Sequence, residues 1–221
     1  MKIKKVIIQN FKCFKNLELK LNRGLNILVG NNEAGKSTII EAIHLALSGL
    51  FNGKYIKYEL TQYLFNNESV NEYLKNPSDL PSILIEIYFE DDSYPLFMGN
   101  ANSEKKDKES GISFKISFDE NYKMEYNELL KKGDIKTLPI EYYEISLITF
   151  ARDTITPKVL PIKSALIDST SGKYQNGSDI YISRIIKENL EHEDTVNISQ
   201  AHRNMRDLFN DDKSIIEINK N

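Results

Sequence analysis

The eight residues 30–37, with the sequence GNNEAGKS, constrain this 221-residue chain more than any other feature. They fit the pattern G-x-x-x-x-G-K-[ST], in which a glycine-rich turn leads from a strand into a helix and cradles phosphate groups. Residues 25–29 form a short apolar run that predicts the strand, and apolar residues recur at helical spacing after Lys36. We therefore predict an α/β fold built around this strand, loop and helix.

Each position of the loop has its own expected role. The two glycines allow a tight turn and a close approach to phosphate oxygens, and the loop amides can form an anion-binding nest. Lys36 supplies a full charge to the β- and γ-phosphates, the Ser37 hydroxyl is offered to Mg²⁺, and Thr38 faces the α-phosphate. The predicted ligands are ATP and Mg²⁺, and the predicted binding residues are Gly30, Asn31, Asn32, Glu33, Ala34, Gly35, Lys36, Ser37 and Thr38. The competing interpretation is a glycine-rich turn that only caps a helix.

Hydrolysis of a bound nucleotide needs a second acidic group beside the metal, and the sequence offers no clear one. Asp168 follows three apolar residues but precedes a serine, which favours a surface turn. The acidic run at residues 90–92 ends a strand and is interpreted as a solvated turn. The three histidines show no metal-ligand spacing.

Charge is distributed unevenly along the chain. The net charge is −3, yet residues 1–57 hold ten Lys or Arg and three Asp or Glu, a local balance of +7. This asymmetry favours an anionic ligand at the N-terminal end, although scattered surface lysines would give the same count. The single cysteine, Cys13, excludes an internal disulfide, and no apolar run is long enough for a membrane span. We expect a cytoplasmic protein with no membrane partner.

The rest of the chain predicts two parts, residues 1–165 and residues 166–221. In the first part, strands are expected at residues 2–9 and 17–21, and a helix from Lys36 to a stop at Gly49. An antiparallel meander with one solvent-facing side is expected over residues 83–150, including alternation at residues 122–126 and a loop at 100–111. Residues 51–82 are expected to be mostly irregular with a short helix. The second part is expected to hold a linker and helices at residues 180–192 and 199–210.

Residues 1–60 resemble the N-terminal segment of ABC-type ATPase heads, a P-loop NTPase fold found in SMC, RecF, RecN and OLD (overcoming-lysogenization-defect) proteins. The resemblance is carried by Asn10, Phe11 and Lys12 after the first strand, and by residues 32–43 in the loop and helix. The continuation at residues 44–66 looks most like OLD-family ATP-dependent endonucleases, including those of Gabija-type anti-phage systems. By this resemblance Lys12 approaches the nucleotide base or ribose, the meander flanks the nucleotide, and the C-terminal helices serve dimerisation.

The resemblance implies the ATP-binding part of an OLD-like DNA endonuclease, in which nucleotide gates head dimerisation and nuclease activity in anti-phage defence. The signature motif, second acidic motif, switch histidine and Toprim nuclease motifs of such proteins are not visible in residues 1–221, so very low activity is expected for this chain alone. Expected partners are the C-terminal half of the head or a second copy, and also DNA and a helicase. The alternatives are an SMC-, RecF- or RecN-like repair ATPase head, and a truncated module that binds nucleotide or a partner without hydrolysis.

Overall fold

In this computed structural model, the structure describes residues 2–90, 94–104, 108–133 and 135–167, together with Ala201 and Met205. The chain divides into two compact units, Met1–Leu166 and Ile167–Asn221. The predictions for Asp168 and for the helix at residues 180–192 lie outside the described residues. Of the helix predicted at residues 199–210, only Ala201 and Met205 are described, and both are helical. Everything below concerns the first unit.

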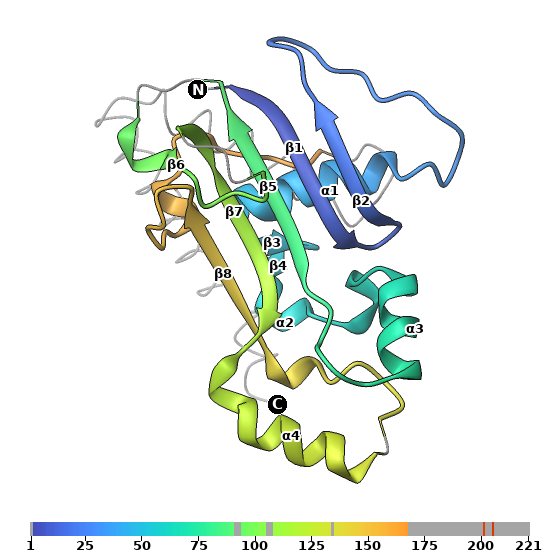
Figure 1. Cartoon of the computed structure of the whole chain (residues 1–221). Helices are drawn as coiled ribbons and strands as arrows, with labels where there is room; N and C mark the ends of the chain where they lie inside the picture. The colour runs from blue at the N-terminus through green and yellow to red at the C-terminus, as the bar shows by residue number, and fades with distance from the viewer. Residues whose placement is uncertain are drawn as a thin grey trace. The chain divides into compact units, whose positions relative to one another are not determined.

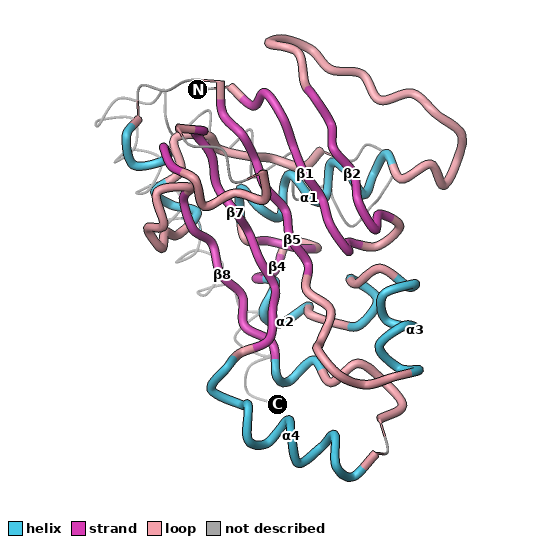
Figure 2. Tube along the Cα trace, in the orientation of Figure 1, coloured by secondary structure: helices cyan, strands magenta, loops and turns pink. Residues whose placement is uncertain are grey.

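A twisted antiparallel sheet forms the centre of this unit (Figure 1). Its strands lie in the order β2-β1-β5-β7-β6, and β8 also pairs with β7. The strands are β1 (Ile3–Phe11), β2 (Phe14–Lys20), β5 (Ile83–Phe89), β6 (Met98–Gly99), β7 (Glu109–Phe118) and β8 (Tyr143–Thr149). The strands predicted at residues 2–9 and 17–21 are thus confirmed, and β5, β7 and β8 confirm antiparallel strands within residues 83–150. Figure 2 shows the strands side by side, with helices and loops around them.

The middle of the sheet is buried on both faces, so the prediction of one solvent-facing side is wrong for β5. Ile85 and Ile87 are fully buried on one face, and Tyr88 and Glu86 are 0% and 2% exposed on the other. The alternation in β5 therefore separates two packed environments rather than core and solvent. The reason is tertiary, because a segment beyond β6 covers the second face.

Helix α1 (Lys36–Ser48) covers the first face and packs against β1 and β5. It ends where predicted, because Gly49 adopts φ 69° and its amide closes onto the Leu45 carbonyl. The buried residues of the helix are Ile39, Ala42, Leu45, Ala46 and Leu47. Ile40, which the sequence placed on the apolar stripe, is 46% exposed. Small alanines at the contact let the helix approach the sheet closely.

Residues 50–82 contain more regular structure than the sequence predicts. The hairpin β3 (Leu50–Phe51) and β4 (Lys54–Tyr55) leads into α2 (Ile56–Glu59), the 3₁₀ turn η1 (Gln62–Leu64) and α3 (Asn67–Lys75). The Asn66 side chain caps α3 by accepting a hydrogen bond from the Glu68 amide at 3.2 Å. Short 3₁₀ turns also occur at η2 (Pro95–Phe97), η3 (Glu120–Tyr122), η4 (Ile140–Tyr142) and η5 (Pro157–Val159).

The strand-like alternation predicted at residues 122–126 is wrong, because these residues belong to η3 and to α4 (Lys123–Lys132). Tyr126, Leu129 and Leu130 recur at spacings of three and four and pack toward the core, which suits a helix. Gly133 at φ 72° ends the helix. The loop predicted at residues 100–111 is shorter than expected, since β7 begins at Glu109. No helix among the described residues is long and apolar enough to cross a membrane.

Candidate functional site

The glycine-rich loop folds into a compact turn in front of α1. Glu33 and Gly35 adopt φ values of 70° and 82°, and the Ala34 amide donates to the Asn31 carbonyl at 3.3 Å. The Lys36 ammonium folds back and donates to the carbonyl oxygens of Gly30 and Asn31, at 2.7 Å each. Lys36 thus ties both ends of the loop together, and its charge faces carbonyl groups rather than a carboxylate.

The N-terminus of α1 presents the donors that an anion requires. Gly35 is the N-cap and offers no side chain, no side-chain cap bond forms at this described end, and the first turn holds no acidic residue. The amides of the first helical residues lack partners within the helix, and the helix dipole concentrates partial positive charge there. Ser37 is exposed and Thr38 is half-buried at this end. Amides, ammonium and hydroxyls therefore converge, a donor set that fits a phosphate chain with a hard cation.

The turn between β1 and β2 supports the loop from one side. A Cβ added at Gly35 would lie 2.9 Å from the Cys13 sulfur and would also clash with the Phe14 ring. Glycine is therefore required at position 35 both by its backbone angle and by this close approach. The packed hairpin fixes the point from which α1 starts.

Lys12, predicted to approach the nucleotide, is held beside α1. Its ammonium lies 2.6 Å from the Glu41 carboxylate and 4.9 Å from the centre of the Phe51 ring. The lysine is thus near the N-terminal half of α1 but engaged by an acidic partner. No local pattern could predict this pair, since Lys12 and Glu41 are 29 residues apart.

The strand predicted at residues 25–29 is absent from the described sheet. Leu25, Ile27 and Val29 are 83%, 74% and 90% exposed, in a long loop that swings away from β2 before α1 begins (Figure 1). The apolar run that predicted a strand is present, but residues 25–29 pair with no strand of the described sheet, not even with its outer strand β2. The phosphate-loop residues thus form their turn without the strand expected before them.

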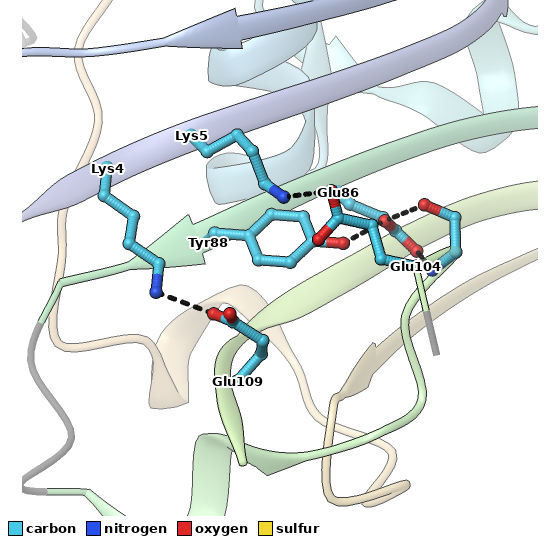
Figure 3. Close-up of polar contacts among 7 residues, drawn as sticks. Lys4, Lys5, Glu86, Tyr88, Glu104 and Glu109 are labelled. Carbon is cyan, nitrogen blue, oxygen red and sulfur yellow. Dashed lines mark hydrogen bonds and ion pairs between the residues drawn. The ribbon is translucent and has the colours of Figure 1, made fainter. Parts of the chain in front are cut away.

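A second polar cluster lies on the other face of the sheet, and the sequence analysis missed it (Figure 3). The buried Glu86 carboxylate accepts hydrogen bonds from the Tyr88 hydroxyl at 2.8 Å and from the Ser103 amide and hydroxyl at 2.7 Å. The Lys5 ammonium lies 2.7 Å from Glu104 and 3.9 Å from the centre of the Tyr88 ring. Burial, and then the neighbouring Glu86 charge, raise the pKa of Tyr88.

This cluster fastens the segment around residues 99–104 over β1 and β5. Both oxygens of the Glu86 carboxylate accept hydrogen bonds, which suits a buried support. Its only sequence signal was Glu86 in an otherwise apolar strand, which reads equally well as a solvent-facing residue. Burial on the second face could be found only from the tertiary structure.

Comparison of the sequence with known proteins shows the family to which the chain belongs. A family model described as an AAA domain matches residues 5–221, which is nearly the whole chain. Curated proteins match over shorter stretches. Structural maintenance of chromosomes protein 6 of Saccharomyces cerevisiae is 53% identical over 45 residues, 20% of this chain and 4% of the relative.

Two further relatives are repair proteins by name. The DNA replication and repair protein RecF of Vibrio parahaemolyticus is 37% identical over 68 residues, 31% of this chain and 18% of the relative. The DNA double-strand break repair Rad50 ATPase of Nanoarchaeum equitans is 39% identical over 56 residues, 25% of this chain and 7% of the relative. The chain thus spans less than a fifth of the length of these relatives.

A solved structure titled "Structural biochemistry of ATP-driven dimerization and DNA stimulated activation of SMC ATPases" is also similar. It is 22% identical, with a TM-score of 0.33, over 53% of this chain and 63% of that chain. The family assignment depends on the matched family model, which covers the glycine-rich loop and the helix that follows it. The chain belongs to the AAA domain family.

Proposed function

We propose that residues 30–38 bind ATP with Mg²⁺ and that the chain is the nucleotide-binding portion of an SMC- and RecF-like ATPase head. The observation that carries this proposal is the closed loop in front of an uncapped α1, with the Lys36 ammonium held between two carbonyl oxygens. On binding, the phosphate oxygens would replace those two carbonyl oxygens as the hydrogen-bond partners of the Lys36 ammonium. The metal would supply charge that offsets the phosphate oxygens.

Each residue of the loop has a distinct part in this proposal. Lys36 neutralises the β- and γ-phosphates, and the free amides at the start of α1 hold the β-phosphate. Ser37 is exposed at the same helix end, where its hydroxyl can reach the metal. Lys12 would have to leave Glu41, or act together with it, to contact the nucleotide.

The proposal includes a partner that completes the sheet beside residues 25–29. Three alternating aliphatic side chains exposed to 74% or more are typical of a strand that lacks its neighbour. The relatives are far longer than the segments they share with this chain. The expected partner is therefore the C-terminal half of the same head, and a second copy of the chain is the alternative.

The wider activity is proposed from the relatives, which include proteins named for DNA replication and repair. An SMC- and RecF-like repair ATPase is therefore the first candidate. The second candidate is the head of an OLD-like endonuclease of an anti-phage system, with DNA and a helicase as partners, and it is favoured by the resemblance of residues 44–66. A nuclease assay on a form of the protein that carries both halves of the head separates them, because only the second candidate cleaves DNA.

Substitution of Lys36 tests the nucleotide site directly. Lys36→Ala should weaken binding of a fluorescent ATP analogue by about tenfold to a hundredfold, because charge-assisted hydrogen bonds to phosphate are lost. Lys20→Ala on β2 is the matched control and should leave the affinity unchanged. Equal affinity of the two variants and the wild type would overturn the proposed site.

ATP turnover by this chain alone tests the remainder of the proposal. Turnover should be near background, since residues 1–221 show no apolar run followed by Asp-Glu that would place a second acidic group beside the metal. Rapid turnover that Lys36→Ala abolishes would show that such an acid exists in this chain. Binding without turnover, even when the other half of the head is added, would favour the module that binds nucleotide or a partner without hydrolysis.

A further inference from the structure

Three tyrosines lie almost fully exposed within nine residues after α1. Tyr55, Tyr58 and Tyr63 are 63%, 78% and 80% exposed, whereas Ile56 and Leu64 in the same segment are 4% and 3% exposed. The two aliphatic residues anchor the backbone in the core, so the rings project from a fixed support. Single exposed apolar residues are ordinary, but three large exposed aromatic rings within nine residues indicate a contact surface.

The three tyrosines belong to consecutive short elements of one segment. Tyr55 is the N-cap of α2 and Tyr58 follows three residues later, so the two are neighbours on one side of this helical turn. Tyr63 lies in η1, five residues further, which limits its Cα to within about 18 Å of that of Tyr58. We call Tyr55, Tyr58 and Tyr63, together with Lys54 and Lys57, the tyrosine surface.

Lysines alternate with these rings and give the surface a positive charge. Lys54 is 71% exposed, and its ammonium lies 3.0 Å from the Glu59 carboxylate, whose side chain is 23% exposed. Lys57 is exposed and forms none of the ion pairs found among the described residues. Aromatic faces between mobile ammonium groups suit a ligand that alternates flat bases with phosphates.

A hollow of about 350 Å³ lies beside this segment and is lined by Thr61 and Gln62, the two residues before Tyr63. Thr61 and Gln62 line it on the side of the tyrosines, and Lys136 and Glu141 line it on the other. The Gln62 side-chain oxygen accepts from the Leu138 amide at 3.2 Å, which fixes the side chain and leaves its NH₂ group as a donor. Polar groups that can meet the edge of a base therefore lie next to the rings.

We infer that the tyrosine surface binds single-stranded DNA, with bases stacked on the rings and phosphates against the two lysines. Duplex DNA would hide the base faces and would need a denser set of cations than this surface offers. Alternating aromatic rings and cations match the alternating bases and phosphates of a nucleic acid strand, whereas a protein partner does not require this alternation. The inference does not depend on nucleotide binding at residues 30–38, so either can fail alone.

The test measures binding of a fluorescein-labelled oligothymidylate to the full chain by anisotropy, without nucleotide. Tyr58→Ala should weaken binding about tenfold, and the triple variant with alanine at positions 55, 58 and 63 by more than a hundredfold. The triple phenylalanine variant should bind within about threefold of the wild type, because the stacking faces remain.

The double variant Lys54→Gln with Lys57→Gln should lower the slope of log affinity against log salt concentration by about 1.4, because two phosphate contacts are lost.

Matched controls keep the test decisive. Tyr94→Ala and Tyr122→Ala alter exposed tyrosines elsewhere and should leave binding unchanged. Equal binding by the triple alanine variant and the wild type would overturn the inference, and so would loss of binding in the triple phenylalanine variant. A wild-type dimer that becomes monomeric only in the triple alanine variant would also overturn it, since a second copy would then occupy the surface. Lys36→Ala should leave DNA binding intact, which separates this inference from the proposed ATP site.

Discussion

Strand β5 and the segment at residues 25–29 are both predicted from the sequence as apolar strands, but they lie in opposite environments. In β5, Ile83, Ile85 and Ile87 are 0% exposed, whereas Ile27 and its alternating neighbours are at least 74% exposed. The difference is in pairing, because β5 lies between β1 and β7, with α1 over one face. Residues 25–29 follow the edge strand β2 and lack these neighbours in the part of the chain that is described. An apolar alternating run thus becomes a strand only where another edge accepts its backbone hydrogen bonds.

The largest effect expected from this comparison is on stability. Ile87→Ala should lower the free energy of unfolding by about 2–5 kcal/mol, because a cavity opens between the sheet and α1. Ile27→Ala should change it by less than about 0.5 kcal/mol, because the side chain is already in solvent. Urea unfolding followed by circular dichroism measures both. A comparable loss at Ile27 would mean that residues 25–29 are packed in solution.

A smaller effect is expected at the junction of the two regions, where the loop meets the packed hairpin. Gly35→Ala should cost about 1–3 kcal/mol, because residue 35 keeps φ 82° and the new methyl meets Cys13 and Phe14. Gly24→Ala is the control, since a Cβ there meets no described atom within 4 Å. Melting temperatures of both variants provide the measurement. A Gly35→Ala variant as stable as Gly24→Ala would show that the loop does not press on the β1–β2 turn.

The smallest effect concerns His44, which lies in the half-buried middle of α1. Its Nδ1 lies 2.9 Å from the Ser164 hydroxyl, and burial lowers the pKa of His44 below its ordinary value of 6.5. The unfolded chain then binds more protons, so His44 contributes stability above pH 6.5 that is lost as pH falls through its folded pKa. His44→Gln should flatten this part of the stability profile between pH 7.5 and 5. A profile identical to that of the wild type would rule out this role for His44.

Much of the loop could be predicted because its determinants are local. Two glycines, a lysine and the amphipathic run after it define a turn and a helix start within 20 residues, and Gly49 ends that helix. The ion pair of Lys12 with Glu41 could not be predicted, since the partners come from separate elements. The residues at 122–126 were misjudged because tyrosine and methionine at alternate positions fit a strand as well as a helix, and packing against the core decided between them.

The sequence by itself determined the order of the strands in the chain, the phosphate-loop motif and the ends of α1, because these depend on residue spacing and backbone chemistry within one segment. Only the tertiary structure decided that Glu86 is buried while Ile27 is exposed. Burial depends on what lies across the sheet or beside its edge, and those neighbours are contributed by residues distant in the chain. For that reason β5 is buried and residues 25–29 are exposed, although both are predicted from the sequence as apolar strands.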